Sequence, residues 1–406
     1  MLGGLEMRVL HIFDHSIPLH SGYSFRSLAI LREQRKLGIE TWHLTSSKHY
    51  GNDSLIEEID GYRFYRTPKG PLAGLPIIGQ YDVVAGLKKR LTKLCDEIKP
   101  DILHAHSPSL NALAASSVAK VRGLPFVYEM RASWEDAAVS HGTCREGSLR
   151  YKLSQRLERA ALNSADHVVT ICQGLSERVQ SWGVPAERIT VIHNGVDLNA
   201  FTPTEKKHPE LTAQYQLQDK IVLGFLGSFY RYEGLHVLLD ALPQMLEALP
   251  NLHLLLVGGG QEEQALKQQA ERLGLTQQIT FTGRIPHQQI NDFYSLIDLF
   301  IYPRESILLT EIVTPLKPLE AMANKGLVIA SDIGGHREMI EHGSNGFLFP
   351  PDNPQALAKT AIELLQQPKN WPQLQQAGRE YVEQQRCWKK SVGQIKPVYQ
   401  RLMEAR

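Results

Sequence analysis

A strand, loop and helix pattern repeats along the chain and constrains its fold more than any other feature. Short apolar runs with strand character lie at Arg8–Asp14 and Glu40–Thr45, and an amphipathic stretch, Phe25–Leu37, lies between them. A helix between two strands favours parallel pairing, because a parallel connection needs a crossover. Further strands of this kind are expected at Asp101–His106, Pro125–Glu129, His167–Ile171 and Ile189–Ile192. We therefore predict an α/β fold with parallel sheets.

The pattern starts again after a stretch of turn and polar residues. Five more strands are expected, at Ile221–Leu226, His253–Val257, Ile279–Thr282, Leu299–Tyr302 and Leu327–Ala330. The segment after Pro354 has a helical pattern throughout. Since 406 residues exceed one ordinary core, we predict a Rossmann-like domain over 1–200, a linker over 201–219 and a second Rossmann-like domain over 220–385. Ligands of such sheets bind at the carboxyl ends of the strands, so we expect a site in a cleft between the domains.

Composition excludes several classes of protein. A net charge of +1 gives no electrostatic reason to expect a nucleic-acid partner. The four cysteines are scattered without metal-type spacing, which favours a reducing compartment. No apolar run is long enough to span a bilayer, and the first residues lack the pattern of a secretory signal peptide. We therefore expect a cytoplasmic protein.

Several motifs, in order, resemble family 4 of the retaining glycosyltransferases, which have the GT-B fold. They are ADHVVTICQGLSERVQSWGVPAERITVIHNGVDLNAF (165–201), IVLGFLGSFYRYEGLHVLLDAL (221–242), TFTGRIPHQQINDFYSLIDLFIYP (280–303) and PLKPLEAMANKGLVIASDIGGHREMIEHGSNGFLFPPDNP (315–354). The pieces HSGYSFRS (20–27), EMRASWED (129–136), GSFYRYEG (227–234) and TPLKPLEAMA (314–323) are similar to a subgroup associated with exosortase and exopolysaccharide loci.

The resemblance implies two Rossmann-like domains that face one another across a cleft, with a C-terminal helix, 386–406, packing back on the first. It implies transfer of a sugar, with retained configuration and without metal or cofactor, from a nucleoside-diphosphate donor, UDP or GDP, to a saccharide acceptor. A polyprenyl-linked acceptor at the inner membrane is one form of this expectation. In the absence of metal, cations, amides and helix N-termini must meet the charge of the leaving diphosphate.

Candidate donor contacts come first from the second domain. Lys317 precedes a helix expected to begin near Pro318, and an ammonium beside free helix amides forms an anion site; the alternative is a solvated surface lysine. By resemblance Glu320 accepts hydrogen bonds from the ribose, although a capping role is an alternative. The family's first glutamate would fall at Ile312, and Glu311 lies one residue earlier. The backbone amides of Leu316 and Lys317 are expected to reach the sugar and the β-phosphate.

The motif GSFYRYEG departs from the family, which has diphosphate-binding cations where this chain has Ser228 and Glu233. Arg231 is the remaining cation of this loop and is expected to take over, unless it is an exposed loop arginine. Because a carboxylate would repel a diphosphate, Glu233 should point away or bind another group. Arg284 and Ile285 match the family's nucleobase loop.

In the first domain, Ser21 and Gly22 occupy the place of the family's glycine loop for phosphate, with an ordinary strand-to-helix turn as the alternative. Arg131 stands where the family has a histidine, and Glu129 should share its side of the strand. We expect Arg131 to act on the leaving phosphate or the acceptor, and Glu129 on a sugar hydroxyl or as nucleophile. A structural Arg–Glu pair is the alternative. Acceptor contacts are also expected in the loop that follows, from Trp134, Glu135, Asp136 and His141.

Two further patterns have more ordinary explanations. His104 and His106 have an H-x-H spacing used by some metal sites, but nothing else in the sequence supports a metal, so we expect none. A basic cluster on a helix expected over 82–98, formed by Lys88, Lys89, Arg90 and Lys93, is either a solvated face or a contact with an anionic membrane. Two other functions stay open: a sugar-nucleotide epimerase and a non-catalytic relative that binds nucleotide or glycan.

Overall fold

The computed structural model describes residues 7–19, 21–51, 54–75, 78–140, 143–204 and 206–405. The chain divides into two compact units. The first comprises residues 1–193 and 388–406, and the second comprises residues 194–387. Each unit has its own sheet.

The first unit is built on an eight-stranded sheet with the order β3-β4-β2-β1-β5-β6-β7-β8. Its strands pair in parallel, apart from the antiparallel pair of β3 and β4. The strands are β1 (Met7–Phe13), β2 (Ile39–Thr45), β3 (Ile56–Ile59), β4 (Tyr62–Arg66), β5 (Ile102–His106), β6 (Phe126–Met130), β7 (His167–Thr170) and β8 (Ile189–Val191). The central strands β1, β5 and β6 are almost entirely buried, as expected of a parallel sheet covered on both faces.

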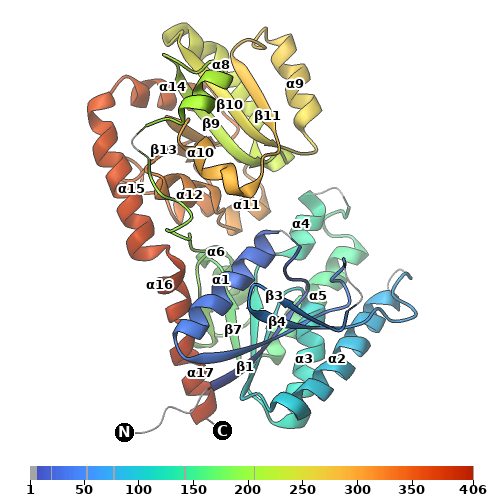
Figure 1. Cartoon of the computed structure of the whole chain (residues 1–406). Helices are drawn as coiled ribbons and strands as arrows, with labels where there is room; N and C mark the ends of the chain where they lie inside the picture. The colour runs from blue at the N-terminus through green and yellow to red at the C-terminus, as the bar shows by residue number, and fades with distance from the viewer. Residues whose placement is uncertain are drawn as a thin grey trace, which may run out of the picture. The chain divides into compact units, whose positions relative to one another are not determined.

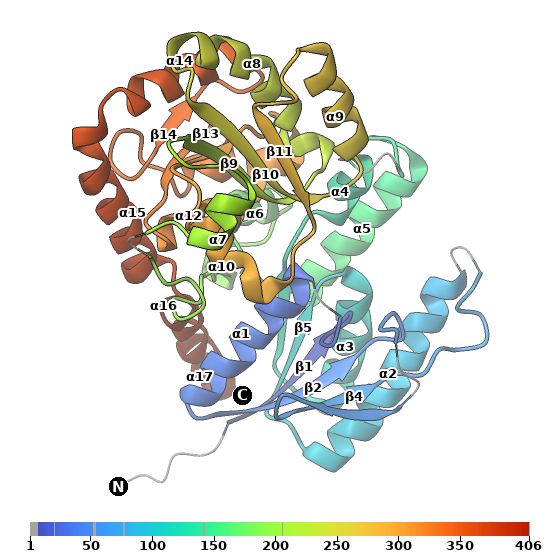
Figure 2. The same ribbon diagram turned by 45° about the horizontal axis from the view of Figure 1, so that its top comes forward.

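Helices cover this sheet, and two of them come from the C-terminal end of the chain (Figure 1). They are α1 (Gly22–Lys36), α2 (Ile78–Ile98), α3 (Ser109–Arg122), α4 (Trp134–Ser140), α5 (Leu149–Ser164), α6 (Gln173–Ser181), α16 (Trp388–Gly393) and α17 (Ile395–Glu404). In Figures 1 and 2, α16 and α17, in red, lie beside α1, in blue. Trp388, Ile395 and Tyr399 are buried in one apolar cluster with Val9 and Ile102 of the sheet. Burial of this face fastens the C-terminal helices to the first unit.

The second unit has a six-stranded parallel sheet with the order β11-β10-β9-β12-β13-β14. Its strands are β9 (Ile221–Ser228), β10 (Leu252–Gly259), β11 (Ile279–Gly283), β12 (Leu299–Tyr302), β13 (Leu327–Ser331) and β14 (Phe347–Phe349). Its helices are α7 (Pro209–Gln214), α8 (Leu235–Ala248), α9 (Glu263–Arg272), α10 (Ile290–Tyr294), α11 (Leu308–Ile312), α12 (Lys317–Ala323), α13 (Gly334–Arg337), α14 (Pro354–Leu365) and α15 (Trp371–Gln385). One large apolar cluster forms the core of this unit.

The predicted α/β class and the parallel sheets are confirmed. The structure also has the hairpin β3–β4, which the prediction lacked, with Asp60 and Gly61 at positive φ in its turn. The predicted linker, 201–219, lies inside the second unit and contains α7, whereas the two units divide between residues 193 and 194. Among the described residues, no helix is long and apolar enough to cross a membrane.

Candidate functional site

The carboxyl edge of the second sheet brings together charged residues from separate strands. Glu233 follows β9 in a short 3₁₀ turn, Arg304 follows β12, and Lys317 begins α12. Parallel strands all end at this edge, which is where ligands of such sheets bind. The sequence therefore places these side chains at one spot although they are up to 84 residues apart.

Glu233 is the centre of this cluster. Its buried carboxylate accepts hydrogen bonds from Nε and Nη2 of Arg304, at 3.1 and 2.9 Å, and from Nζ of Lys317 at 2.6 Å. Burial alone would raise the pKa of Glu233, but Arg304 and Lys317 outweigh it and lower the pKa to about 2. The expectation that Glu233 binds another group is thus met by two cations. The three charges sum to one surplus positive charge.

Two glycines make room for this cluster. A Cβ on Gly227 would lie 2.2 Å from Cε of Lys317, so the lysine stem crosses directly over this glycine at the end of β9. A Cβ on Gly234 would lie 1.8 Å from the carbonyl oxygen of Pro303, and Gly234 has a φ of +71°. The glycines that begin and end GSFYRYEG therefore permit close approach of Lys317 and of the segment that carries Arg304.

Lys317 remains accessible, with 21% of its side chain exposed. The hydroxyl of Tyr302 donates to its carbonyl oxygen at 3.0 Å, which fixes the start of α12. One turn later, Glu320 accepts a hydrogen bond from the hydroxyl of Tyr294 at 2.9 Å and is half-buried. An ammonium and a carboxylate thus stand one turn apart on the same short helix.

The other predicted donor residues lie along this edge with different surroundings. Ser228 and Arg284 are exposed, and Leu316 and Ile285 are half-buried against the core of the unit. Arg231 is exposed, but its guanidinium pairs with Glu305 at 3.1 Å and with Glu262 at 3.9 Å. The charge of Arg231 is therefore partly neutralised by two carboxylates. Arg304, which was not predicted as a site residue, is buried beside Lys317.

Ile312, at the place of the family's first glutamate, ends α11. Glu311 accepts a hydrogen bond from the backbone N–H of Gly334 at 2.7 Å and pairs with Arg337 at 3.1 Å. Its carboxylate thus holds α11 against the start of α13. In this conformation Glu311 therefore has a structural role.

In the first unit, Ser21 caps α1, and its hydroxyl oxygen accepts from the backbone N–H of Ser24 at 3.1 Å. Nε2 of His15 lies 2.8 Å from the same hydroxyl, and Nδ1 of His15 lies 3.1 Å from Asp14. Gly22 is exposed, with open space where a Cβ would stand. The predicted phosphate loop is thus the N-terminus of a 15-residue helix with no acidic residue in its first turn, which favours an anion.

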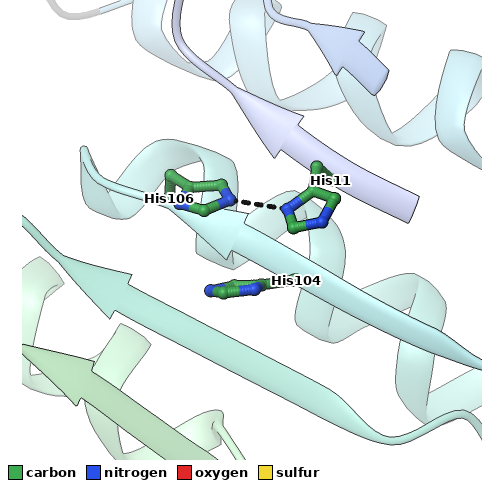
Figure 3. Close-up of side chains that lie close together, drawn as sticks. All are labelled: His11, His104 and His106. Atoms are coloured by element: carbon green, nitrogen blue, oxygen red, sulfur yellow. Dashed lines mark hydrogen bonds between the residues drawn. The ribbon is translucent and has the colours of Figure 1, made fainter. Parts of the chain in front are cut away.

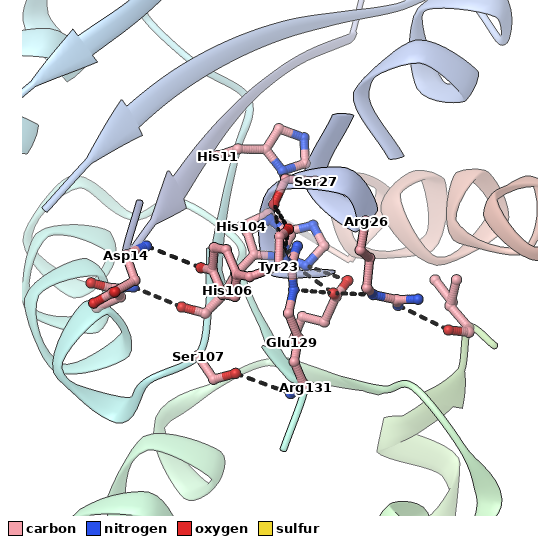
Figure 4. A network of polar contacts seen from close by, with 12 residues as sticks. His11, Asp14, Tyr23, Arg26, Ser27, His104, His106, Ser107, Glu129 and Arg131 are labelled. Atoms are coloured by element: carbon pink, nitrogen blue, oxygen red, sulfur yellow. Dashed lines mark hydrogen bonds and ion pairs between the residues drawn. The ribbon is translucent and has the colours of Figure 1, made fainter. Parts of the chain in front are cut away.

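Glu129 and Arg131 form a buried ion pair, at 2.7 Å between Nε and Oε1, and both lie on the same side of the sheet as expected (Figure 4). A second buried arginine, Arg26 of α1, donates to the same oxygen at 3.0 Å. Arg131 also donates to Ser27 and to His106, both at 2.8 Å. Although burial opposes its charge, Arg26 and Arg131 hold the pKa of Glu129 well below its usual range. In this conformation both side chains of the pair are buried, and the guanidinium of Arg131 is engaged by protein groups.

His104 and His106 are joined by His11 in a buried cluster of three imidazoles (Figure 3). Nδ1 of His11 lies 2.9 Å from Nε2 of His106. Nδ1 of His106 accepts a hydrogen bond from Arg131, so its proton must be on Nε2, the nitrogen that a metal ion would need. Burial lowers the pKa of all three rings, to about 4 for His11, so the rings are neutral near pH 7. In this conformation Nε2 of His106 is engaged with His11 rather than open to a metal ion.

The loop after β6 carries the expected acceptor residues. Trp134 is exposed, whereas Glu135 and Asp136 are buried. Asp136 accepts a hydrogen bond from the hydroxyl of Tyr151 at 2.6 Å. Of the residues expected here, Trp134 is the one that presents a large surface to solvent, while His141 lies outside the described residues.

Four residues of these clusters were missed by the sequence interpretation: His11, His15, Arg26 and Arg304. His15 and Arg304 each come two residues after a buried strand, which is a usable signal in a parallel sheet. His11 lies inside a strand and Arg26 inside a helix, where no local pattern marks them. Their importance comes from tertiary contacts alone.

Comparisons with known proteins agree with this architecture. A family model described as "Glycosyl transferase 4-like domain" matches residues 21–195, and one described as "Glycosyl transferases group 1" matches residues 208–381. The chain is 25% identical over 383 residues to a D-inositol 3-phosphate glycosyltransferase of Corynebacterium urealyticum, covering 88% of this chain and 87% of the relative. It is 26% identical to the putative glycosyltransferase EpsD of Bacillus subtilis, covering 72% and 74%.

Solved structures of similar fold include sucrose-phosphate synthase from Thermosynechococcus elongatus, with a TM-score of 0.78, 22% identity and coverage of 98% of this chain and 100% of that one. Another is Anabaena Alr3699/HepE in complex with UDP, with a TM-score of 0.76, 20% identity and coverage of 97% and 100%. These likenesses confirm the expected two-domain GT-B fold. The two family models, both of glycosyltransferase domains, together match residues 21–195 and 208–381, so the chain belongs to the glycosyltransferases.

Proposed function

We propose that this glycosyltransferase moves a sugar, with retained configuration and without metal or cofactor, from a nucleoside-diphosphate donor to a saccharide acceptor. UDP and GDP are the donor nucleotides we favour, and the acceptor is a saccharide or a polyprenyl-linked saccharide of surface polysaccharide biosynthesis. The observation that carries the donor side is the accessible Lys317 ammonium, held by Glu233 at 2.6 Å and one turn from Glu320.

The charge arrangement supports this assignment. A leaving diphosphate gains negative charge in the transition state, and a preorganised cation stabilises it more than a mobile one. Glu233 fixes Nζ of Lys317, and Gly227 leaves room for the stem. The charges of Arg304, Lys317 and Glu233 sum to one net positive charge, and Arg304 is buried. We assign Lys317 to the diphosphate and Glu320 to the ribose hydroxyls.

The remaining predicted residues take supporting places in this proposal. We propose Ser228, Arg284, Ile285 and Leu316 as further donor contacts at the same sheet edge of the second unit. Ser21 and Gly22 stand at the N-terminus of α1, whose free amides suit a phosphate. Arg231 takes part in diphosphate binding only by leaving Glu305. Because Arg131 and Glu129 are buried, we assign them to shaping the acceptor side rather than to attack on the sugar.

Membrane contact is part of the proposal and rests on α2. Ile78, Tyr81, Lys88, Lys89 and Lys93 all lie on its exposed side, with apolar residues in its first turns and lysines further along. Tyr81 is 74% exposed. A helix with exposed apolar and basic residues suits an anionic bilayer surface, where a polyprenyl-linked acceptor would be presented. We therefore propose a cytoplasmic enzyme that binds peripherally to the inner membrane, in a subgroup associated with exopolysaccharide loci.

Incubation with a panel of UDP- and GDP-sugars, followed by proton NMR, tests this function. We expect release of nucleoside diphosphate and a glycoside product with the anomeric configuration of the donor. A product of inverted configuration would contradict the retaining mechanism. An isomerised donor would instead support an epimerase, and binding without turnover would support a non-catalytic relative.

A further inference from the structure

A series of buried hydrogen bonds in the first unit leads from Arg131 through His106, His11, Gln34 and Tyr399 of α17 to His104, and the five residues after Arg131 are fully buried. A charge contact of 3.8 Å from His104 to Glu129 closes the circuit, which we call the ring; Figures 3 and 4 show its three histidines. Loss of one hydrogen bond in such a network is destabilising, because an unpaired polar group in a low-dielectric interior raises the free energy of the folded state. The direction of each hydrogen bond in it follows from the arginine end, because a guanidinium can only donate.

The series of hydrogen bonds begins at the guanidinium of Arg131, which can only donate. Nδ1 of His106 lies 2.8 Å from Nη2 of Arg131 and 3.4 Å from Oε1 of Glu129. Because the guanidinium can only donate and makes the shorter contact, this nitrogen accepts and the proton of the neutral ring is on Nε2. Nε2 of His106 then donates to Nδ1 of His11 at 2.9 Å. His11 consequently carries its own proton on Nε2, which donates to Oε1 of Gln34 at 2.8 Å.

The other end of the ring is a group that only accepts. Nε2 of Gln34 donates to the hydroxyl of Tyr399 at 3.2 Å, and this hydroxyl donates to Nδ1 of His104 at 2.5 Å. The proton of His104 is therefore on Nε2, which faces Oε2 of Glu129 at 3.8 Å; this contact is electrostatic, since it is too long for a hydrogen bond and neither atom has a hydrogen-bond partner among the described residues. All the dipoles run from the arginine to the carboxylate, so the two charges reinforce every hydrogen bond between them.

We propose that Tyr399 is a positioning residue, whose hydroxyl completes this ring and thereby fixes the orientation of Arg131 and Glu129. The inference rests on the proposed function for its catalytic consequence, and on the geometry alone for the ring itself. Without the hydroxyl, Gln34 loses an acceptor and His104 loses a donor. A rotated Gln34 amide would reverse the proton positions of His11 and His106, and the hydrogen bond from Arg131 to His106 would be lost.

Nitrogen NMR of protein labelled at histidine tests the ring directly, with signals assigned through single-histidine variants. In the wild-type protein near pH 7 we expect all three rings to be neutral with the proton on Nε2. A proton on Nδ1 of His106 would overturn the ring. In Tyr399→Phe we expect changed signals for His11 or His104, and unchanged signals for both would remove Tyr399 from it.

Kinetics test whether the ring matters for transfer. Loss of one or two buried hydrogen bonds is expected to lower kcat of Tyr399→Phe by about tenfold, with the donor KM nearly unchanged. Tyr381→Phe is the matched control, because it deletes a hydroxyl that accepts from Arg386 at 2.7 Å in the second unit, and its kcat should stay close to that of the wild type. Equal losses in both variants would contradict a positioning role.

Failure of the ring and failure of the proposed function give different results in these experiments. If the wild-type protein transfers no sugar from any donor, that result counts against the proposed function, and the nitrogen spectra still decide the ring. Wild-type spectra also decide it if Tyr399→Phe does not fold.

Discussion

The Glu233 carboxylate lies where the family has a diphosphate-binding cation, and its contacts explain how the chain tolerates it. Arg304 and Lys317 surround it, so the cluster stays net positive while each cation gains a fixed partner. A buried charge without its counterion is strongly destabilising, whereas a complete cluster is tolerated. At this site the replacement of one residue is therefore compensated by two others.

Glu233→Gln should destabilise the second unit by about 3 kcal/mol at pH 7, because Arg304 and Lys317 lose their counterion. The pKa of Glu233 is lowered to about 2, so its stabilisation is fully present above pH 4.5 and is lost as the pH falls toward 2. Unfolding free energies at pH 7 and pH 3 should therefore differ less in the variant than in the wild type.

Exposed Glu363, which pairs with Lys359 at 3.9 Å, supplies the control for this substitution. Glu363→Gln should change the unfolding free energy by less than about 0.5 kcal/mol. Both substitutions are measured by urea unfolding. Equal effects would show that the Glu233 cluster contributes no more to the unfolding free energy than an exposed ion pair does.

At the scale of elements, strand β6 and helix α5 share a buried carboxyl group. The hydroxyl of Tyr128 donates to Glu158 at 2.6 Å, and burial raises the pKa of Glu158 to about 8. The folded protein therefore keeps Glu158 protonated at neutral pH, whereas the unfolded chain ionises it. This linkage makes the packing of α5 on β6 less favourable as the pH rises.

Glu158→Gln should consequently raise the thermal midpoint at pH 8, since the amide cannot ionise in the unfolded chain. The penalty in the wild type begins above pH 4.5 and grows until about pH 8. Differential scanning calorimetry at several pH values checks this, and the advantage of the variant should vanish near pH 4.5. A difference that does not vary with pH would mean that Glu158 titrates normally.

Helix α2 allows a test of the membrane proposal. Lys88→Glu combined with Lys89→Glu should abolish sedimentation with vesicles that contain anionic lipid, because each basic residue near such a surface contributes about 1 kcal/mol. Lys359→Glu combined with Lys369→Glu makes the same change in charge at exposed positions of the second unit. Binding that is lost equally in both double variants would indicate a nonspecific effect of net charge.

At the scale of the molecule, the sequence predicted the repeated elements well and the charge contacts poorly. Long apolar runs such as Ile221–Leu226 identify buried parallel strands, because both of their faces are covered. The hairpin β3–β4 was missed although its Asp60–Gly61 turn carries a recognised signal. The position of Arg304 after a strand marks it as a candidate, but its pairing with a carboxylate 71 residues away could not be predicted. Arg26 lies inside a helix and pairs with a carboxylate 103 residues away, so no local pattern marks it.

In the proposed donor site, Lys317 binds the diphosphate and Glu320 binds the ribose. Calorimetric titration of the wild type, Lys317→Ala and Glu320→Gln with UDP, GDP and the corresponding nucleosides separates the two roles. Lys317→Ala should lose turnover and affinity for the diphosphates while its affinity for the nucleosides stays unchanged. Glu320→Gln should weaken both kinds of ligand by roughly 1–3 kcal/mol. Unchanged diphosphate affinity in Lys317→Ala would contradict the assignment of Lys317 to the diphosphate.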